Sequence, residues 1–423
     1  MPDDCSRTKD YTILIIGASY AGITAALTIL ALRDGQKPPL ETYVSIPNLK
    51  KESQGVNLKI VLLDKRDGFF HTVSTPLVHV TPEHASHLWR RYIGFPKLRR
   101  PDVQIIQGSV LAMNPGCHCV AYIDGQGHSA TISYDYAIIS TGVRREWPVA
   151  PGSDHRFIYL DHALNSACSV RAATKHGVVV IGGGAVGVEF AGKIKLAYPH
   201  NSVTLVHSRD QLLSKEPLPE RFKSRVLEML REQGVKVILG ERPAVIILPD
   251  NTYRIELNHK SHIFADRVIW ATLQSIPSTG FLPDSTLNDD GTIKIDAQQR
   301  VLGEPLLFNH VFAAGDVTER QEIKLAGTAM LMGLVAAANI YSLILADAGR
   351  WRRAAMTTCP PVYLGPKMSL SIGSNMLSYS GGDDASIREG EDIARVVFGA
   401  DLGWQRILNS LGLQDYDDDR IVN

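Results

Sequence analysis

The sequence predicts an α/β protein, because a buried strand, a glycine-rich turn and a helix follow one another twice. In the first copy, Thr12–Thr24, four apolar residues precede a turn with Gly17 and Gly22 and an alanine-rich run. Four successive apolar residues are typical of a buried parallel strand. The N–H groups of such a turn, with the positive end of the helix, suit the pyrophosphate of a dinucleotide. Ser19 stands where the middle glycine of this motif is usual, so an ordinary strand-to-helix turn stays an alternative.

The second copy, Val178–Gly192, carries the full G-x-G-x-x-G pattern after four apolar residues. Gly182 suits the tight turn, Gly184 lets the backbone approach phosphates, and Gly187 lets the helix pack closely on the strand. Two such turns in one chain indicate two dinucleotides held toward each other. A flavin and a nicotinamide are the simplest pair.

Composition limits the classes of function. A chain of 423 residues is too long for a single core, so we expect two or three domains. A formal net charge of zero argues against a general nucleic-acid binder. Five cysteines favour a reducing compartment over a disulfide framework. Cys117–Cys119 has no accompanying second ligand pair, so we expect a loop there and no metal site.

The sequence favours a cytoplasmic protein. Its N-terminus is polar, and Pro2 stands where myristoylation requires glycine. The most apolar long stretch, Ala326–Ala346, contains polar Asn339 and Ser342. We therefore expect a buried helix there, with a membrane span as the alternative. Peripheral binding to a membrane surface is possible but not favoured.

Two strand ends carry candidate ribose contacts. Leu58–Leu63 reads as a strand ending at Asp64, where an acidic residue usually accepts hydrogen bonds from a ribose. The polar, proline-containing stretch 33–57 reads as a surface insertion that lengthens the spacing. Ser202–Val206 ends instead near Arg209, which could meet a 2′-phosphate and favour NADPH. For both residues, a solvated side chain is the alternative.

Three further segments should come near the cofactors. The loop that contains His71 is expected to approach the flavin. An apolar strand running into Thr141 and Gly142 suits a crossing between two domains. A buried strand that ends in Gly315 and Asp316 suits a turn beside a polyol.

The order of these motifs resembles the two-dinucleotide-binding-domain flavoproteins of the pyridine nucleotide-disulfide oxidoreductase superfamily. The matching landmarks are Gly17-Ala-Ser-Tyr-Ala-Gly22, Ser140-Thr-Gly142, Gly182-Gly-Gly-Ala-Val-Gly187-Val-Glu189 and Ala314-Gly-Asp316. The chain looks most like the apoptosis-inducing-factor-2, or ferroptosis-suppressor, branch, through Asp64-Lys-Arg-Asp-Gly-Phe-Phe-His71, Val203-Thr-Leu-Val-His-Ser-Arg209 and Lys324-Leu-Ala-Gly327. The resemblance implies an FAD enzyme that uses NADH or NADPH to reduce quinones.

Carried over by position, the resemblance implies FAD and NAD(P)H sites and a small set of catalytic residues. The implied cofactor-binding residues are Gly17, Ser19, Tyr20, Ala21, Gly22, Asp64, Lys65, Thr141, Gly142, Gly182, Gly184, Gly187, Arg209, Gly315 and Asp316. The implied catalytic residues are Glu189, Lys324 and His71. For Glu189 and Lys324, a solvated surface side chain is the alternative.

The sequence also departs from the family pattern. No Cys-x4-Cys lies on the helix after the flavin turn, so we do not expect disulfide reduction. The Ala-Gln-x-x-Ala-x-Gln quinone signature of type II NADH dehydrogenases is replaced by the sequence of Ala326–Gly333. The second crossing reads Ala271-Thr-Leu273 where Ala-Thr-Gly is usual.

The implied fold has two Rossmann-like dinucleotide-binding domains and a C-terminal α+β segment. We expect the FAD-binding domain in residues 1–147 and 298–348, an inserted NAD(P)H-binding domain in 148–297, and the C-terminal segment in 349–423. Pro360–Pro366 and Ser369–Ile372 read as turns and strands. Near the end, apolar residues share one helix face, at Trp404, Ile407, Leu408 and Leu411. We expect this face to pack on the chain itself, with a membrane or a second chain as alternatives.

The sequence thus predicts an enzyme that passes hydride from NAD(P)H through flavin to a quinone-like or aromatic small molecule. Alternatives are a flavin-dependent tailoring oxidase or monooxygenase of a specialised metabolite, or a redox-sensing interaction protein. Either a monomer or a homodimer is compatible with the sequence.

Overall fold

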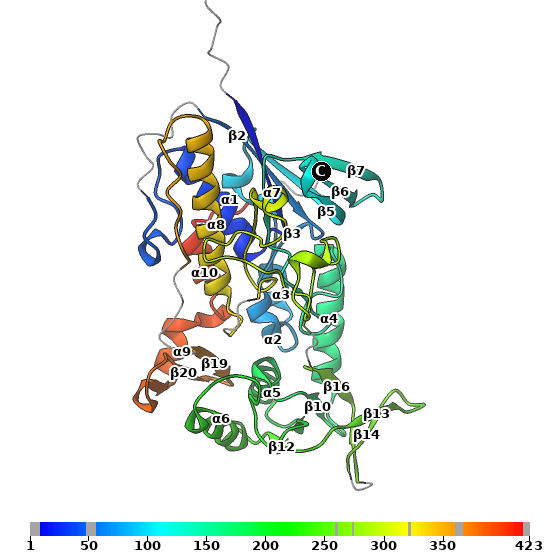
Figure 1. Cartoon of the computed structure of the whole chain (residues 1–423). Coiled ribbons are helices and arrows are strands. Elements are labelled where there is room, and N and C mark those ends of the chain that lie inside the picture. The colour runs from blue at the N-terminus through cyan, green and yellow to red at the C-terminus, as the bar shows by residue number, and fades with distance from the viewer. Residues whose placement is uncertain are drawn as a thin grey trace, which may run out of the picture.

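The computed structural model describes residues 9–47, 56–258, 261–272, 275–319, 323–359 and 367–417. These residues form two lobes and a C-terminal segment (Figure 1). The second lobe contains the second copy of the glycine motif. The first lobe is formed by the parts of the chain that come before and after the second lobe. The α/β prediction with two Rossmann-like units is confirmed.

The first lobe is built on a seven-stranded sheet in the order β18-β8-β1-β2-β5-β6-β7. The strand β1 pairs in parallel with both β2 and β8. The strand β18 continues the parallel part at β8, whereas β6 and β7 extend β5 as antiparallel strands. The bounds are β1 (Asp10–Ile16), β2 (Asn57–Asp64), β5 (Val103–Asn114), β6 (Cys119–Asp124), β7 (Ser129–Ser133), β8 (Tyr136–Ile139) and β18 (Val311–Ala313).

Two long helices lie side by side against this sheet, α1 (Tyr20–Arg33) and α8 (Ala326–Asp347) (Figure 1). They touch backbone to backbone, because a Cβ on Gly333 would overlap the carbonyl oxygen of Ala21. By length and hydropathy alone α8 could cross a membrane, but 83% of its most apolar window is buried. It is the core helix that the sequence predicted.

The segment predicted as a surface insertion contributes to this core. Val44 is 6% exposed and packs near α1 and α8, together with Leu40 and Ile46. Residues 48–55 of the predicted insertion lie outside the described residues.

The second lobe has a four-stranded parallel sheet in the order β12-β11-β10-β16. The helices α5 and α6 share one core cluster with it, and a small antiparallel sheet, β13-β14-β15, packs on the other side. The bounds are α4 (Arg156–Ala172), β10 (Val178–Ile181), α5 (Ala185–Ala197), β11 (Val203–Val206), α6 (Glu220–Glu232), β12 (Lys236–Ile238), β13 (Ala244–Ile247), β14 (Tyr253–Glu256), β15 (His262–Ala265) and β16 (Arg267–Trp270).

Short elements complete the two lobes. Where the chain passes between the lobes, β9 pairs antiparallel with β17. The hairpin β3–β4 and the helices α2 and α3 lie on the first lobe near the junction (Figure 1). The bounds are β3 (Gly68–Phe70), α2 (Thr75–Val78), α3 (Glu83–Leu88), β4 (Trp89–Arg91), β9 (Val143–Arg144), β17 (Ile276–Pro277) and α7 (Pro305–Phe308).

The C-terminal segment contacts both lobes. Its antiparallel strands, β19 (Met368–Ile372), β20 (Asn375–Tyr379) and β21 (Ile387–Glu389), pack on α5 and α6. After α9 (Glu391–Val397), the last helix, α10 (Trp404–Leu411), returns to the core of the first lobe. Its apolar face is therefore covered by the chain itself, as predicted. The turns predicted at Pro360–Pro366 lie outside the described residues.

Candidate active site

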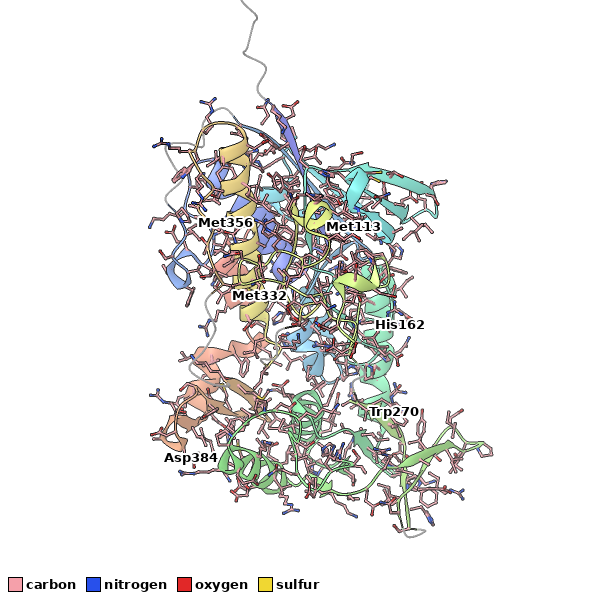
Figure 2. The ribbon with its side chains drawn as sticks, viewed as in Figure 1. Met113, His162, Trp270, Met332, Met356 and Asp384 are labelled. Atoms are coloured by element: carbon pink, nitrogen blue, oxygen red, sulfur yellow. The ribbon has the colours of Figure 1, made fainter. Side chains whose placement is uncertain are left out.

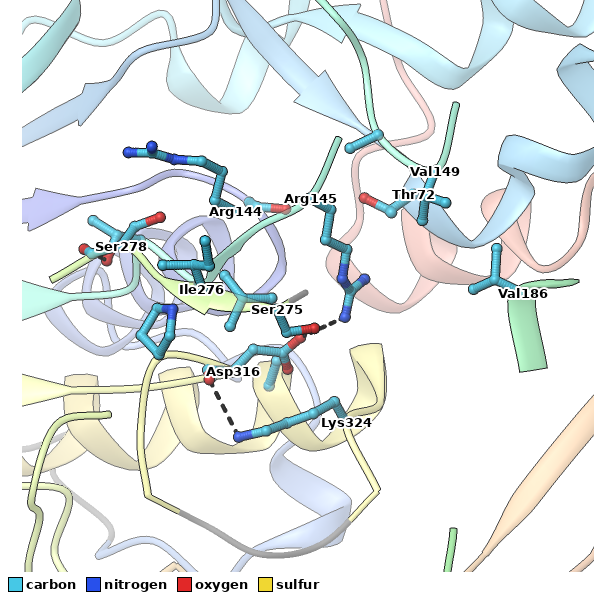
Figure 3. A pocket seen from close by; sticks show the side chains of 18 of the residues that line it. Thr72, Arg144, Arg145, Val149, Val186, Ser275, Ile276, Ser278, Asp316 and Lys324 are labelled. Atoms are coloured by element: carbon cyan, nitrogen blue, oxygen red, sulfur yellow. Dashed lines mark hydrogen bonds and ion pairs between the residues drawn. The ribbon is translucent and has the colours of Figure 1, made fainter. Parts of the chain in front are cut away.

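Both glycine-rich turns face one cavity of about 1670 Å³ at the junction of the lobes. Figure 3 shows part of its lining. Fifteen of the predicted site residues line it: Gly17, Ser19, Tyr20, Ala21, Asp64, Lys65, Thr141, Gly142, Gly182, Gly184, Glu189, Arg209, Gly315, Asp316 and Lys324. The cavity exceeds the volume of about 300–1,000 Å³ that is usual for one drug-sized ligand.

The first turn needs glycine for two different reasons. Gly17 has a φ of +91°, and a Cβ there would lie 2.5 Å from the carbonyl oxygen of Ser140. The Ser140 hydroxyl donates a 2.6 Å hydrogen bond to the Gly17 carbonyl and fixes the crossing strand beside the turn. Gly22 does not line the cavity. A Cβ on it would overlap the Gly17 carbonyl, so Gly22 brings the helix onto the strand.

The second turn repeats this arrangement. Gly182 has a φ of +119°, and a Cβ there would lie 2.6 Å from the carbonyl oxygen of Ala271 on the crossing strand. A Cβ on Gly187 would overlap the Gly182 carbonyl. Gly184 differs, because its open side meets only a Glu216 oxygen, at 3.9 Å. This bare backbone at a helix N-terminus fits a dinucleotide pyrophosphate.

Asp64 is tied to the first turn at the end of β2. Its carboxylate accepts hydrogen bonds from the backbone N–H groups of Ala18, at 2.6 Å, and Arg66, at 2.8 Å. A carboxylate has about four acceptor sites, so two such bonds leave capacity for a ribose hydroxyl. Lys65 beside it forms an ion pair of 3.1 Å with Asp154, which also lines the cavity.

Asp316, at the turn after β18, is held by two cations (Figure 3). Arg145 Nη2 lies 3.3 Å from its carboxylate. Lys324 Nζ donates to the backbone carbonyls of Asp316, at 3.2 Å, and Thr318, at 3.1 Å. Arg145 was missed in the sequence. The signal was the arginine pair that directly follows the crossing at Gly142.

Glu189 is buried, with 8% of its surface exposed, which excludes the solvated alternative. It accepts a 3.1 Å hydrogen bond from the backbone N–H of Ser371 on β19. Burial raises the pKa of Glu189 to about 7. Lys193, one turn further along α5, donates to the Gly373 carbonyl at 2.7 Å, and burial lowers its pKa. The C-terminal hairpin thus forms the wall behind Glu189.

The residues that line the cavity do not include His71, which the resemblance implied as a catalytic residue. The ring is 1% exposed and stacks on Trp404, with centroids 4.9 Å apart. Burial lowers its pKa to about 4, so it is neutral. Nε2 faces the Leu402 carbonyl at 3.2 Å and must donate, so Nδ1 accepts from the Tyr20 hydroxyl at 2.8 Å. Tyr20 lines the cavity, and His71 positions it.

The part of the cavity lining that follows β11 and β12 carries positive charge. The loop after β12 runs beside Arg209, whose carbonyl accepts from the N–H of Gly240 at 2.8 Å. This pairing brings Arg242, a second exposed arginine that the sequence reading missed, into the cavity lining. His207 Nδ1 accepts a 3.1 Å hydrogen bond from the N–H of Gly183. In all, eight lysines and arginines line the cavity, against five carboxylates.

Within the described residues, no group of three or more histidine, cysteine or acidic side chains could hold a metal ion. The polar groups that converge on this cavity are backbone N–H groups, cations and paired carboxylates. Together with the two glycine turns, they define the class of protein: an oxidoreductase that holds two dinucleotides across one cavity.

Comparison with known proteins gives the family. Residues 11–333 match the pyridine nucleotide-disulphide oxidoreductase family, and the chain belongs to it. Oxidoreductase OXR1 of Ajellomyces capsulatus is 36% identical over an alignment of 417 residues that covers 94% of this chain and 87% of that protein. Ferroptosis suppressor protein 1 of Mus musculus is 26% identical over an alignment of 339 residues that covers 78% of this chain and 80% of that protein. The chain is also similar to apoptosis-inducing factor homolog A of Dictyostelium discoideum.

Solved structures agree on the fold. The water-forming NADH oxidase of Lactobacillus brevis superposes with a TM-score of 0.61 at 18% identity, over 87% of this chain and 74% of that one. A NAD-dependent persulfide reductase of A. fulgidus superposes with a TM-score of 0.65 at 19% identity, over 89% of this chain and 65% of that one. By its family, the protein is an FAD-dependent NAD(P)H oxidoreductase.

Proposed function

We propose that the enzyme passes hydride from NAD(P)H through FAD to a quinone-like or other aromatic acceptor. The observation that carries the proposal is the single cavity that both dinucleotide turns share. One continuous space of this size can hold the two cofactors with their rings in contact. FAD, when bound, supplies the two-electron redox chemistry.

An apolar part of the cavity wall supports the choice of an aromatic acceptor. Four of its side chains belong to, or pack against, the core cluster beneath α5: Val149, Val186, Ile323 and Met368. Figure 3 shows Val149 and Val186 at one end of the cavity, close to Thr72. Such a surface favours a flat apolar molecule, because its binding releases ordered water from both surfaces.

We propose distinct roles for the residues around the two rings. The turn at Gly17 and the carboxylates of Asp64 and Asp316 hold FAD. The turn at Gly184 holds the pyrophosphate of the nicotinamide nucleotide. Glu189, with a pKa near neutrality, can hold or release a proton at its carboxylate during acceptor reduction. Lys324, fixed on two carbonyls, places a positive charge at the cavity wall.

We propose NADPH as the preferred reductant. Arg209 and Arg242 lie on adjoining loops, and both line the end of the cavity that follows β11 and β12. The three residues directly after β11 are His207, Ser208 and Arg209, and none of them is the acidic residue that usually accepts a 2′-hydroxyl. Two guanidinium groups suit the 2′-phosphate of NADPH.

Steady-state turnover tests the acceptor proposal. The FAD-loaded enzyme is assayed with NADPH or NADH and with a panel of quinones, with oxygen alone as the reference acceptor. We expect at least one quinone to raise the rate of nucleotide oxidation well above the oxygen rate. Equal rates with and without quinones would contradict the proposal. Very slow turnover combined with NAD(P)H-dependent self-association would favour the redox-sensing alternative.

We further propose that the enzyme works in the cytoplasm as a monomer or homodimer. Support comes from α10, because Trp404, Leu408 and Leu411 are each at most 2% exposed in the core of the first lobe. That face is therefore not available to a membrane. Cell fractionation and analytical ultracentrifugation test the proposal, and recovery of the native protein in the membrane pellet would contradict it.

A further inference from the structure

A second, smaller cavity lies where the linker between the lobes meets α4. Its volume is about 460 Å³, within the range of small-molecule sites. The lining comprises two aromatic rings, three polar side chains of α4, one glycine and one arginine: Trp147, Gly152, His162, Asn165, Ser166, Ser169 and Arg267. His162 belongs to α4, and Figure 2 shows where it lies on that helix.

The rings of this cavity are fixed in an arrangement that suits a planar ligand. Trp147 and His162 have centroids 6.1 Å apart at an interplanar angle of 62°. Gly152 keeps the space beside them open, because a Cβ there would lie 3.3 Å from His162 Nδ1. Trp147 is held from behind by His79, at a centroid distance of 5.1 Å.

Within the described residues, no carboxylate forms an ion pair with Arg267, the cation of this cavity. Arg267 Nε is buried and has no hydrogen-bond acceptor among the described residues. The neighbouring carboxylate of Asp266 is occupied instead by the backbone N–H groups of residues 175–177, at 2.8–3.0 Å. An anionic ligand that reaches the guanidinium of Arg267 would supply the counter-charge that the described residues do not.

The hydroxyl protons of Ser166 and Ser169 are already donated within the protein, so these side chains offer the cavity only acceptor oxygens. His79 Nε2 must donate to the Pro148 carbonyl, at 3.4 Å, because a carbonyl only accepts. His79 is neutral, since burial lowers its pKa to about 4, so its Nδ1 accepts the Ser166 hydroxyl proton at 2.6 Å. Ser169 donates to the Asn165 carbonyl at 2.8 Å. The arginine is therefore the part of the lining that suits an anion.

We propose that this cavity is a second small-molecule site, which binds an aromatic carboxylate. The carboxylate pairs with Arg267, and the ring lies against Trp147 and His162. This site is separate from the dinucleotide cavity and does not depend on the acceptor proposed above.

The two cavities share one wall. Trp147 and Gly152 line the smaller cavity, whereas the linker residues between them, Val149, Ala150 and Pro151, line the larger one. Because a ligand in either cavity contacts the same short linker, we expect coupled binding. Coupling is reciprocal, so each ligand must change the affinity for the other by the same factor.

Titration calorimetry of the FAD-loaded protein with benzoate, and with uncharged benzamide, tests the site. We expect benzoate to bind and benzamide to bind at least about tenfold more weakly, because a charge-assisted hydrogen bond is lost. Arg267→Met should weaken benzoate binding by a similar factor. Arg171→Met is the control for loss of an arginine, since Arg171 is exposed on α4 and does not line the cavity. Ser169→Trp should fill the cavity and abolish benzoate binding.

Two results would overturn the proposed site, and a third would overturn its coupling to the main cavity. Equal affinities of the native protein for benzoate and benzamide would show that the cavity does not recognise the negative charge, and this result needs no variant. Benzoate binding that survives both Arg267→Met and Ser169→Trp would place the ligand elsewhere, including the main cavity. An unchanged benzoate Kd in the presence of saturating NADP⁺ would overturn the coupling between the cavities.

Discussion

At the scale of single residues, the glycines of the two turns act in different ways. A Cβ on Gly22 or Gly187 would overlap the carbonyl of the first glycine in its own turn, so these residues set the distance between helix and strand. Gly184 instead leaves bare backbone toward the cavity. Fold and ligand binding can therefore be separated by substitution.

We predict that Gly187→Ala and Gly184→Ala fail in different assays. Gly187→Ala should destabilise the second lobe by about 2 kcal/mol or more, because the helix must move off the strand. Gly184→Ala should change the free energy of unfolding by less than about 0.5 kcal/mol but weaken binding of the nicotinamide nucleotide. Urea unfolding and nucleotide titration measure the two effects. Equal stability losses in both variants would contradict this division.

Glu189 makes stability depend on pH in a defined direction. Its pKa is raised by burial from 4.5 to about 7, so the folded state binds more protons than the unfolded state between these values. The stabilisation from the protonated side chain is complete below about pH 4.5 and is lost as the pH rises through about 7. The total is on the order of 3 kcal/mol.

We predict that Glu189→Gln removes this pH dependence. The amide keeps the acceptor for the Ser371 N–H but has no proton to lose. Between pH 5 and pH 8, wild-type stability should fall relative to the variant by roughly 2–3 kcal/mol, as measured by urea unfolding at each pH. Glu216→Gln, from the same cavity, is the control for loss of a carboxylate. Parallel stability curves for wild type and Glu189→Gln would contradict the assignment.

We predict that Arg209→Ala discriminates between the nucleotides. Loss of one charge-assisted hydrogen bond should lower kcat/KM for NADPH about tenfold or more, while kcat/KM for NADH stays within about twofold. Arg221→Ala, an exposed arginine on α6 outside the cavity lining, should change neither value. Similar losses with both nucleotides would indicate that Arg209 does not contact the 2′-phosphate.

The site residues that the sequence predicted belong to local motifs, whose spacing is fixed by one strand and one helix. Arg242 was missed because only the pairing of its loop with the loop of Arg209 brings it to the cavity. The contact between Glu189 and Ser371 joins residues 182 positions apart, which no local pattern signals. The stacking of His71 on Trp404 likewise joins residues far apart in the sequence, so no local pattern signals it.

At the scale of elements, α10 is the point where the C-terminal segment is fixed to the first lobe. Trp404 is 2% exposed, packs edge to face on Phe69 with centroids 5.0 Å apart, and stacks on His71. Its indole Nε1 donates a 2.6 Å hydrogen bond to the His87 carbonyl. The helical spacing of the apolar face was visible in the sequence, but its partner was not.

We predict that Trp404→Ala destabilises the protein by about 3–5 kcal/mol, because it removes a buried aromatic ring and its hydrogen bond. The variant should also release FAD more readily, since His71 loses its stacking partner and no longer fixes Tyr20. Val396→Ala, at a side chain that is 81% exposed on α9, should stay within about 0.5 kcal/mol of wild type. Unaltered FAD retention in Trp404→Ala would contradict the proposal that Trp404 acts on FAD binding through His71 and Tyr20.

The long apolar helix α8 shows that composition alone does not distinguish a membrane span from a core helix. Hydropathy alone did not separate a membrane span from a core helix in α8. Asn339 gave the better signal, because its side chain bonds to the backbone of Thr357 and Gln298 inside the first lobe. An amide placed to satisfy buried backbone groups indicates a protein interior.

At the scale of the whole molecule, the C-terminal segment holds the two lobes around the cavity. Its hairpin is fixed to the second lobe by Glu189, Lys193 and Gln233, whose side chains all bond to the backbone of residues 371–373. Arg225 on α6 adds two hydrogen bonds of 2.7 Å to Glu389. The α10 helix then fixes the same segment to the first lobe. This arrangement keeps the two dinucleotide turns facing one another.

Anaerobic stopped-flow absorbance tests most directly whether this cavity couples the two nucleotides to an aromatic acceptor. The FAD-loaded protein is mixed first with NADPH or NADH and then with a quinone. We expect rapid loss of the absorbance of oxidised flavin, faster with NADPH, and its return when the quinone is added. Flavin that stays oxidised with both nucleotides, or that is reduced but not reoxidised by any quinone, would contradict the proposed function.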